Sequence, residues 1–378
     1  MNDNTVSTSS ERRLESMLGS MLKANGTDLF ITGDAYPSIK VDGSLTAISD
    51  EKISKNHVNK LVAGIMNEHQ LAEFMAMQEC NFAIDISGLS RFRVNAFRQK
   101  NTSGMVLRTI HSDIPSLEQC QLPEVLKDIV MSARGLILIV GGTGSGKSTS
   151  MASMLSYRNY HSQGHIVTIE DPIEYIHQHQ QCIITQREVG IDTQSYAAAL
   201  KNTLRQAPDV IMLGEIRDDE TMQYAMTFAE TGHLCIATLH ANSADQAIER
   251  ILNFFPEEKR AQTLMDISMN LCACISQRLV RLQGGDGRVP ACEILHNTPL
   301  ISELIYKGQL RKLKEHMSAS KQANMKTFDQ SLFELIQAGK ISVEEGLRHA
   351  DSMNNLRLRC KLENSDDLKK GTEQWAVV

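Results

Sequence analysis

The sequence lacks paired cysteines. Its eight cysteines are scattered along 378 residues and include no CxxC pair, so the pattern indicates neither a zinc ribbon nor a disulfide framework. A chain with this cysteine usage is suited to a reducing compartment. We therefore expect a cytoplasmic protein.

The sequence also lacks long apolar runs and an excess of basic residues. No apolar stretch approaches the roughly 20 residues that a helix needs to cross a bilayer, so we expect no direct membrane insertion and any membrane association to go through a protein partner. The formal net charge of −6 argues against a chain whose main role is to bind nucleic acid. Platforms of aromatic and basic residues for stacking bases are also missing, which disfavours a nucleic-acid motor.

What is present is a globular composition. Hydrophobic residues make up 42% of the chain and charged residues 22%, which is enough apolar material for a buried core. At roughly 150 residues per domain, the length predicts two folded domains.

The first domain is expected to be a small α/β domain over residues 1–112. Apolar residues at helical spacing in 14–22 and 58–66 predict two amphipathic helices. Between Arg91 and Phe97, apolar and cationic or polar residues alternate, which predicts a strand with one apolar and one cationic face. A further strand is expected at Met105–Ile110.

The second domain is expected over residues 124–360, after a linker at 113–123 that contains Pro115 and Pro123. It opens with the apolar run Leu136–Val140, which is typical of a central parallel strand. Further strand-like runs near residues 165–169, 210–213 and 234–239 alternate with helical stretches, as in a doubly wound α/β sheet. Residues 361–378 are polar and predict a disordered tail.

The strongest chemical signal follows the first apolar run directly. It is a complete G-x-x-x-x-G-K-[ST] pattern between a strand and a helix, in which backbone N–H groups can surround a β-phosphate. In such a loop Lys147 would bridge the β- and γ-phosphates of ATP, and the Ser148 hydroxyl would ligate Mg²⁺. The alternative is a glycine-rich turn that binds nothing. The predicted ATP-binding residues of this loop are Gly141, Gly142, Thr143, Gly144, Ser145, Gly146, Lys147, Ser148 and Thr149.

Two other predicted strands end in carboxylates. Glu215 follows the buried run at 210–213 and is placed to lie beside Mg²⁺ or its waters. Glu170, Asp171 and Glu174 follow another strand, and one of them could polarise an attacking water. The competing interpretations are a Glu that only ends a strand and a solvated acidic turn.

Histidines and arginines complete the set of candidates. His233 and His240 flank the predicted strand at 234–239, and an extended segment of that length keeps them too far apart to share one metal. One of them could lie near the γ-phosphate, and the alternative for each is a hydrogen-bonded structural histidine. Charge that grows on the γ-phosphoryl group calls for an arginine, although most arginines are only solvated surface groups. The arginine candidates are Arg91, Arg93, Arg98, Arg108, Arg217 and Arg250.

In their order and content, these segments resemble the PilT/PilU-type ATPases of the secretion-ATPase superfamily. The resemblance runs from Thr27 to about Arg359. Residues 141–149 are similar to the family's Walker A box and 170–174 to its Asp box. Residues 214–218 are similar to the Walker B box and 229–240 to the His box.

The resemblance implies a fold, an assembly and residue roles that the spacing of the motifs cannot indicate. It implies a PAS-like first domain, a RecA-like P-loop ATPase domain, a homohexameric ring, and ATP held between domains and subunits. The implied catalytic residues are Glu170 as base, Glu215 as the Mg²⁺-associated carboxylate, Arg217 and His240. The implied additional ATP-binding residues are His233, Arg93, Arg98 and Arg108.

Two departures favour the PilU branch of this family. Pilus-extension and type II secretion ATPases usually have a tetracysteine metal site, which this sequence lacks, so the retraction branch is favoured. PilT-type proteins have an Ala-Ile-Arg-Asn-Leu-Ile-Arg-Glu signature, whereas Leu300–Lys307 here reads LISELIYK and contains no arginine.

The resemblance thus implies a hexameric motor that powers or assists type IV pilus retraction and twitching motility. Its implied partners are a PilT-type retraction ATPase and an inner-membrane pilus platform protein, with the ring peripheral to the membrane at the pilus base. The alternative is an accessory nucleotide-binding ring that supports a PilT-type motor without driving retraction alone.

Overall fold

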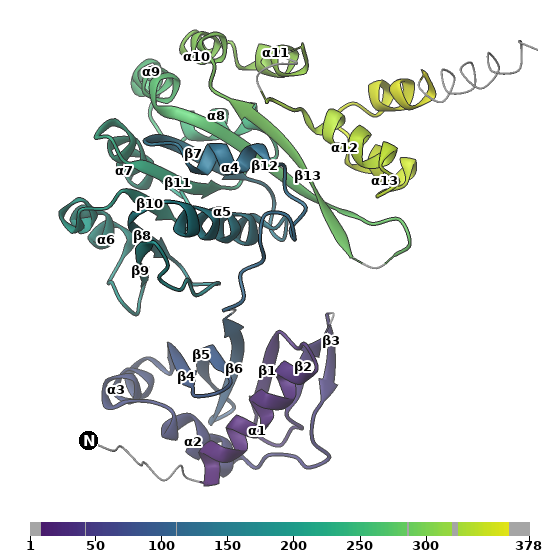
Figure 1. Ribbon diagram of the computed structural model, residues 1–378. Coiled ribbons are helices and arrows are strands. Elements are labelled where there is room, and N and C mark those ends of the chain that lie inside the picture. The colour runs from purple at the N-terminus through teal and green to yellow at the C-terminus, as the bar shows by residue number, and fades with distance from the viewer. Residues whose placement is uncertain (1–8, 42, 111, 286, 320–323, 363–378) are drawn as a thin grey trace, which may run out of the picture. The chain divides into compact units, whose positions relative to one another are not determined.

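The computed structural model describes residues 9–41, 43–110, 112–285, 287–319 and 324–362. The chain divides into two compact units (Figure 1). The first consists of residues 1–113 with 174–176, and the second of the remainder. The mixed α/β class predicted from the sequence is confirmed.

The N-terminal unit is an antiparallel sheet with strand order β3-β2-β1-β6-β5-β4. Helices α1 and α2 pack against its strands β1 and β6, and α3 packs against β4. Its strands are β1 (Asp28–Thr32), β2 (Ser38–Val41), β3 (Ser44–Ala47), β4 (Glu79–Ile86), β5 (Ser90–Gln99) and β6 (Thr102–Ile110), and its helices are α1 (Ser9–Lys23), α2 (Lys55–Gly64) and α3 (Glu68–Met77).

Local sequence explains these elements. In β5 the side chains of Phe92, Val94 and Ala96 are buried in one core, and the intervening residues are partly exposed, so the predicted two-faced strand is confirmed. Helix α3 begins with a capping box, in which the Asn67 side chain accepts from the Gln70 N–H and the Gln70 side chain accepts from the Asn67 N–H. Such reciprocal caps satisfy N–H groups that the helix itself cannot.

The second unit is built on a seven-stranded sheet with order β13-β12-β7-β11-β10-β8-β9. Neighbouring strands are parallel except for β13, which is antiparallel to β12. The strands are β7 (Gly135–Val140), β8 (Gly164–Glu170), β9 (Cys182–Glu188), β10 (Val210–Leu213), β11 (Leu234–Leu239), β12 (Leu271–Arg281) and β13 (Arg288–His296).

Helices cover both faces of this sheet, as a parallel sheet requires. Leu136, Leu138 and Val140 of β7 belong to one core together with α7 to α10, whereas Ile137 and Ile139 belong to another with α4 and α5. All of β7 is therefore buried. The helices are α4 (Val125–Val130), α5 (Lys147–His161), α6 (Tyr196–Thr203), α7 (Asp219–Glu230), α8 (Ala244–Leu252), α9 (Arg260–Asn270), α10 (Pro299–Tyr306) and α11 (Leu313–Ala319).

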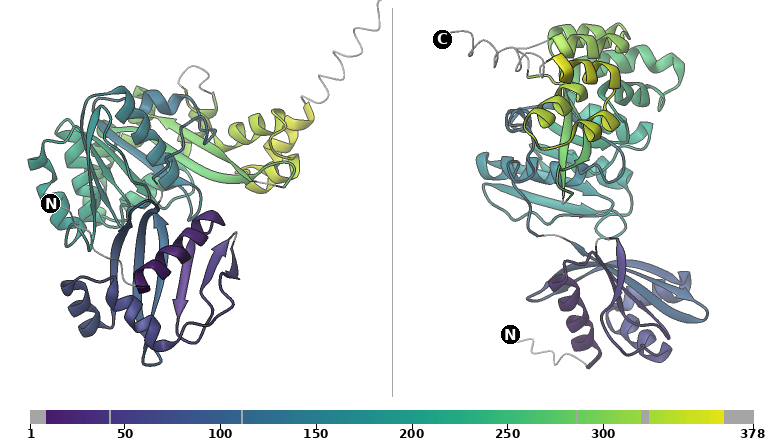
Figure 2. Two further views of the ribbon diagram at one scale, coloured as in Figure 1. Left: turned by 60° about the horizontal axis from the view of Figure 1, so that its bottom comes forward. Right: turned by 90° about the vertical axis from the view of Figure 1, so that its right-hand side faces the viewer.

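The helices that follow residue 325 form a separate small core on the β12–β13 hairpin. Figure 2 shows this hairpin reaching out to these yellow helices. Val280 and Val289 of the hairpin pack with Phe328 and other buried residues of the following helices. We call residues 325–362 the C-terminal module; it contains α12 (Phe328–Gln337), α13 (Val343–His349) and a last helical stretch at 353–362.

Most of the predicted linker at 113–123 belongs to the second unit. This unit includes residues 114–123, and Leu117 and Leu122 are buried in its core. Of the predicted tail at 361–378, residues 363–378 lie outside the described residues. None of the helices in the described part of the chain is both long enough and apolar enough to span a membrane.

A buried carboxylate links the sheet to α8. The side chain of Glu293 on β13 is fully buried, and its Oε1 accepts from the Ala244 N–H at 2.9 Å and from the Ser276 hydroxyl at 3.4 Å. Burial, only partly offset by these bonds, raises the pKa of Glu293 from 4.5 to about 7.

This raised pKa predicts a pH dependence of stability. Between pH 4.5 and about 7 the folded chain holds a proton on Glu293 that the unfolded chain releases. The free energy of unfolding is therefore highest below this window. It falls by up to roughly 3 kcal/mol as the pH rises through the window. We expect Glu293→Gln to lose this pH dependence in urea unfolding. The exposed variant Glu344→Gln is the control, and equal pH slopes for all three chains would contradict the assignment.

Candidate functional site

The predicted functional segments follow four neighbouring strands of the second sheet. In the order β7-β11-β10-β8 all four strands are parallel, so their carboxyl ends lie at one edge. The glycine-rich loop follows β7, His240 follows β11, Glu215 follows β10, and Glu170 ends β8. Ligands of open α/β sheets bind outside this edge.

The glycine-rich loop leads directly into α5, which begins at Lys147. Gly146 caps this helix with a left-handed φ of 88°, a conformation that glycine adopts without steric cost. The Lys147 ammonium donates to the carbonyl oxygens of Gly141 at 2.9 Å and Gly142 at 3.0 Å. The loop thus places a cation and a helix N-terminus together, as anion binding requires.

Gln277 on β12 supports this loop, and the sequence reasoning missed it. Its Oε1 accepts from the Ser150 hydroxyl at 2.7 Å, and both residues are buried. A Cβ at Gly146 would lie 2.8 Å from Gln277 Nε2, and one at Gly141 would lie 2.6 Å from the Gln277 carbonyl oxygen. The loop therefore lies tightly against β12. A single glutamine in a strand has no signal that reveals such a contact before the fold is known.

The residues of the loop fit a triphosphate and Mg²⁺. Ser145 Oγ is buried and has no hydrogen-bond partner in the described chain, which is unusual for a buried hydroxyl. Ser148, one residue into α5, is only partly buried. Among the described residues no group of three or more His, Cys, Asp or Glu side chains could hold a metal by itself. Mg²⁺ needs no such cage, because substrate phosphates and waters complete its shell.

Glu215 is the centre of a small charged group at the end of β10. Its Oε2 accepts from Arg217 Nε at 2.8 Å, and its Oε1 lies 3.2 Å from His240 Nε2. Arg217 Nη1 also lies 3.4 Å from Asp171 Oδ2. The Glu215 side chain is only 20% exposed, so these partners hold it in one place. The structure thus brings together the predicted Glu215, Arg217 and His240.

Glu170 lies at the end of the adjacent strand and is buried. Its Oε1 accepts from the Thr168 hydroxyl at 2.7 Å and from Gln186 Nε2 at 3.1 Å. A Cβ at Gly214 would lie 2.8 Å from the Tyr196 hydroxyl and 3.3 Å from the Glu170 Cα, so a larger residue there would displace its neighbours at the ends of β8 and β10. Thr168 and Gln186 are further residues that no sequence pattern indicated.

The structure does not bring His233 into this group. His233 precedes β11, and Leu234 is in register with Gly135 at the start of β7, so it lies at the opposite edge of the sheet. Its Nδ1 is 3.0 Å from the Thr231 hydroxyl and 3.3 Å from the Phe228 carbonyl oxygen. Its role in ATP binding stays a prediction that would require a second copy of the chain.

The three arginines predicted to bind ATP belong to the N-terminal unit and do not share one face of its sheet. Arg93 and Arg108 are cross-strand partners on β5 and β6, and Arg108 forms a 2.7 Å ion pair with the buried Asp28. Arg98 is on the other face of β5, where its guanidinium lies 5.4 Å from the centre of the Phe74 ring. Their approach to ATP stays a prediction, and Glu174 groups with this unit as well.

Comparison with known proteins identifies the class. The family described as Type II/IV secretion system protein matches residues 4–348, so the chain belongs to this family.

Relatives place the chain more narrowly. It is 54% identical to the type IV pilus ATPase PilU of Pseudomonas aeruginosa over 353 residues, which cover 93% of this chain and 92% of that protein. It is 40% identical to PilT of the same organism, a type IV pilus retraction ATPase, over 90% of this chain and 98% of that protein. The chain belongs to the PilT/PilU-type secretion ATPases, as the sequence motifs predict.

Solved structures agree. The crystal structure of the pilus retraction motor PilT with bound ADP superimposes with a TM-score of 0.85 at 35% identity, covering 90% of this chain and 98% of that one. The ATPase DotB of Legionella pneumophila matches with a TM-score of 0.75 at 25% identity, over 90% of this chain and 96% of that one. An N-terminal domain followed by an ATPase domain is therefore confirmed.

The glycine-rich loop allows a sharp test of site geometry. We expect Gly146→Ala to weaken ADP binding about tenfold or more. The alanine backbone would have to adopt a φ of 88°, and its Cβ would lie 2.8 Å from Gln277 Nε2. The measurement is a titration with fluorescent ADP. Gly190→Ala is the control, since Gly190 has a φ of 86° with no atom within 4 Å of an added Cβ. Equal affinity of the two variants would show that the contact with β12 is unimportant.

Proposed function

We propose that this chain hydrolyses ATP at the carboxyl edge of its parallel sheet and uses the energy to power or assist retraction of type IV pili. The observation that carries the proposal is the convergence of the Lys147 loop, His240, Glu215 and Glu170 on four adjacent parallel strands. Membership of the PilT/PilU-type secretion ATPases supports the same activity.

Each residue has a role that its surroundings support. The Lys147 ammonium would neutralise charge on the β- and γ-phosphates together with the N-terminus of α5. Ser148 and Glu215 would hold Mg²⁺, directly or through its waters, and the bound ion would offset charge on the phosphates. His240 and Arg217, both in contact with Glu215, would sense and stabilise the γ-phosphoryl group.

Glu170 is the proposed catalytic base. It is buried, and donors from Thr168 and Gln186 hold its Oε1, so its carboxylate is oriented before a water is bound. A pre-oriented base avoids the cost of reorganisation in the transition state. Thr168 and Gln186 then act as positioning residues.

The proposal extends to assembly. We infer a homohexameric ring in the cytoplasm, peripheral to the inner membrane, in which nucleotide lies between domains and between subunits. The PilT structure with bound ADP supports nucleotide as ligand. His233, Arg93, Arg98 and Arg108 would act there from a domain or subunit other than the one that supplies the loop. A PilT-type ATPase and an inner-membrane pilus platform protein are the proposed partners.

A second function is favoured by one observation. Helix α10, at the position of the PilT-type signature, contains no arginine and exposes Leu300 and Tyr306. A helix surface without the two arginines of that signature would not act on the pilus machinery as the PilT surface does. The ring would then be an accessory that supports a PilT-type motor without driving retraction alone.

The activity itself is tested at Lys147. We expect Lys147→Ala to reduce steady-state ATP turnover roughly a hundredfold or more, because nothing else in the loop carries a positive charge on a side chain. Phosphate release is the measurement. Lys307→Ala, at the exposed C-cap of α10 and paired with Glu303, is the matched control. Near-normal turnover in Lys147→Ala would refute the proposal.

The choice between motor and accessory ring is tested by reconstitution. We expect the purified chain to have the mass of a hexamer by light scattering and to hydrolyse ATP. We expect Glu215→Ala to abolish this hydrolysis. Addition of a PilT-type ATPase should leave the turnover per subunit unchanged for a self-sufficient motor. Hexamers that hydrolyse ATP only in the presence of the PilT-type protein would favour the accessory ring.

A further inference from the structure

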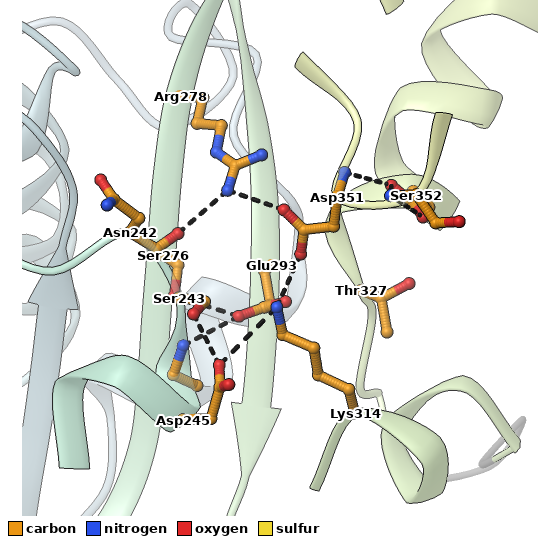
Figure 3. A network of polar contacts seen from close by, with 12 residues as sticks. Asn242, Ser243, Asp245, Ser276, Arg278, Glu293, Lys314, Thr327, Asp351 and Ser352 are labelled. Carbon is orange, nitrogen blue, oxygen red and sulfur yellow. Dashed lines mark hydrogen bonds and ion pairs between the residues drawn. The ribbon is translucent and has the colours of Figure 1, made fainter. Parts of the chain in front are cut away.

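Arg278 on β12 joins the loop after His240 to the C-terminal module. Figure 3 shows its guanidinium between Asn242 and Asp351. Its Nη2 donates to the Asn242 carbonyl oxygen at 3.2 Å and to Asp351 Oδ1 at 2.8 Å, and its Nη1 donates to the His349 carbonyl oxygen at 2.5 Å. One planar group thus bonds three acceptors from two separate parts of the unit.

The contacts on the side of the module fix the guanidinium firmly. Its centre lies 3.9 Å from the centre of the Phe328 ring, a stacked cation–π geometry that suits arginine better than lysine. Asp351, its ionic partner, also accepts from Lys314 Nζ at 2.7 Å. The Asp351 N–H in turn donates to Asp329 of α12 at 2.8 Å. Arg278 is therefore anchored both to the C-terminal module and to the loop after His240.

The contacts on the other side lead to the catalytic centre. Asn242 is two residues after His240, whose ring lies 3.2 Å from Glu215. Lys314 makes a second link to this segment, since its Nζ lies 3.7 Å from Asp245 Oδ1. The buried Glu293 accepts from the Ala244 N–H. The segment from Asn242 to Asp245 is therefore held by side chains of β12, β13 and α11.

We propose that Arg278 is a positioning residue for ATP hydrolysis, through which the C-terminal module sets the place of His240 beside Glu215. Asp351 holds the guanidinium, and the guanidinium holds the Asn242 carbonyl group. A movement of the module changes the His240–Glu215 contact without contact between the module and the nucleotide. The inference rests on the proposed ATPase function.

Neighbouring residues of β12 give this arrangement a physical basis. Side chains of successive strand residues point to opposite faces. Gln277 accepts from Ser150 in the first turn of α5 and lies against Gly141 and Gly146 of the glycine-rich loop, whereas Arg278 bonds the loop after His240. One strand thus supports both loops of the site. Coupling between sites can be carried by hydrogen-bond and salt-bridge networks on rigid secondary elements, and β12 with Arg278 connects the two loops in this way.

The test compares Arg278→Lys, Asp351→Asn and the double variant with the parent chain. Lysine keeps the charge but cannot bond the three acceptors in one plane. We expect each single variant to lower kcat for ATP about fivefold or more, with KM and ADP affinity nearly unchanged. Because both residues act in one connection, the double variant should be no slower than the slower single variant.

Hydrogen exchange reports the positioning directly. We expect faster exchange of the amides of residues 239–245 in Asp351→Asn, because Asp351 holds Arg278 and Lys314, which contact Asn242 and Asp245. Arg348→Gln is the control, since Arg348 lies on α13 and pairs only with Glu344 and Glu345 of that helix in the described contacts. It should change neither kcat nor exchange.

The outcomes separate the two proposals. Absence of turnover in the parent chain would refute the proposed ATPase function. Normal parent turnover with unchanged kcat in Arg278→Lys and Asp351→Asn would overturn the positioning role alone, as would additive losses in the double variant. If Arg278→Lys does not fold, Asp351→Asn with its exchange readout decides, because Asp351 reaches residues 239–245 through Arg278 and Lys314.

Discussion

The burial of the parallel strands on both faces is the constraint on which the rest of the structure depends. Every residue of β7, β10 and β11 is buried, so their side chains are committed to the two cores and cannot take part in chemistry. These three strands contain no charged residue, so the charged groups of the site lie where the strands end. Because the strands are parallel, those ends share one edge, and four functional segments from separate parts of the sequence meet there.

Polar contacts then determine the geometry at this edge. Thr168 and Gln186 orient Glu170, Arg217 and His240 surround Glu215, and Gln277 supports the glycine-rich loop. The buried bonds of Glu170 and Gln277 are strong when complete and costly when one partner is lost. Gln186 and Gln277 come from strands that contribute no recognised motif, so the site is larger than its four motifs.

The antiparallel pair β12–β13 extends this logic to the end of the chain. Gln277 and Arg278 point to opposite faces of β12, and the far part of the hairpin carries the small core of the C-terminal module. A strand that forms part of the main sheet, supports two loops of the site and bears a helical module can transmit displacement among them. This is the route by which we propose that the C-terminal module influences ATP hydrolysis.

The sequence by itself determined the α/β class, the two-faced β5 strand, the motif residues and the family, since these depend on period, spacing and chemistry within short segments. It could not determine the strand order that makes β7, β11, β10 and β8 neighbours, because pairing between distant strands leaves no local pattern. For the same reason only the tertiary structure showed that Arg93 pairs with Arg108 across β5 and β6. It alone revealed Gln277, Gln186 and Arg278, whose roles arise from contacts with residues 127, 16 and 36 positions away in the sequence.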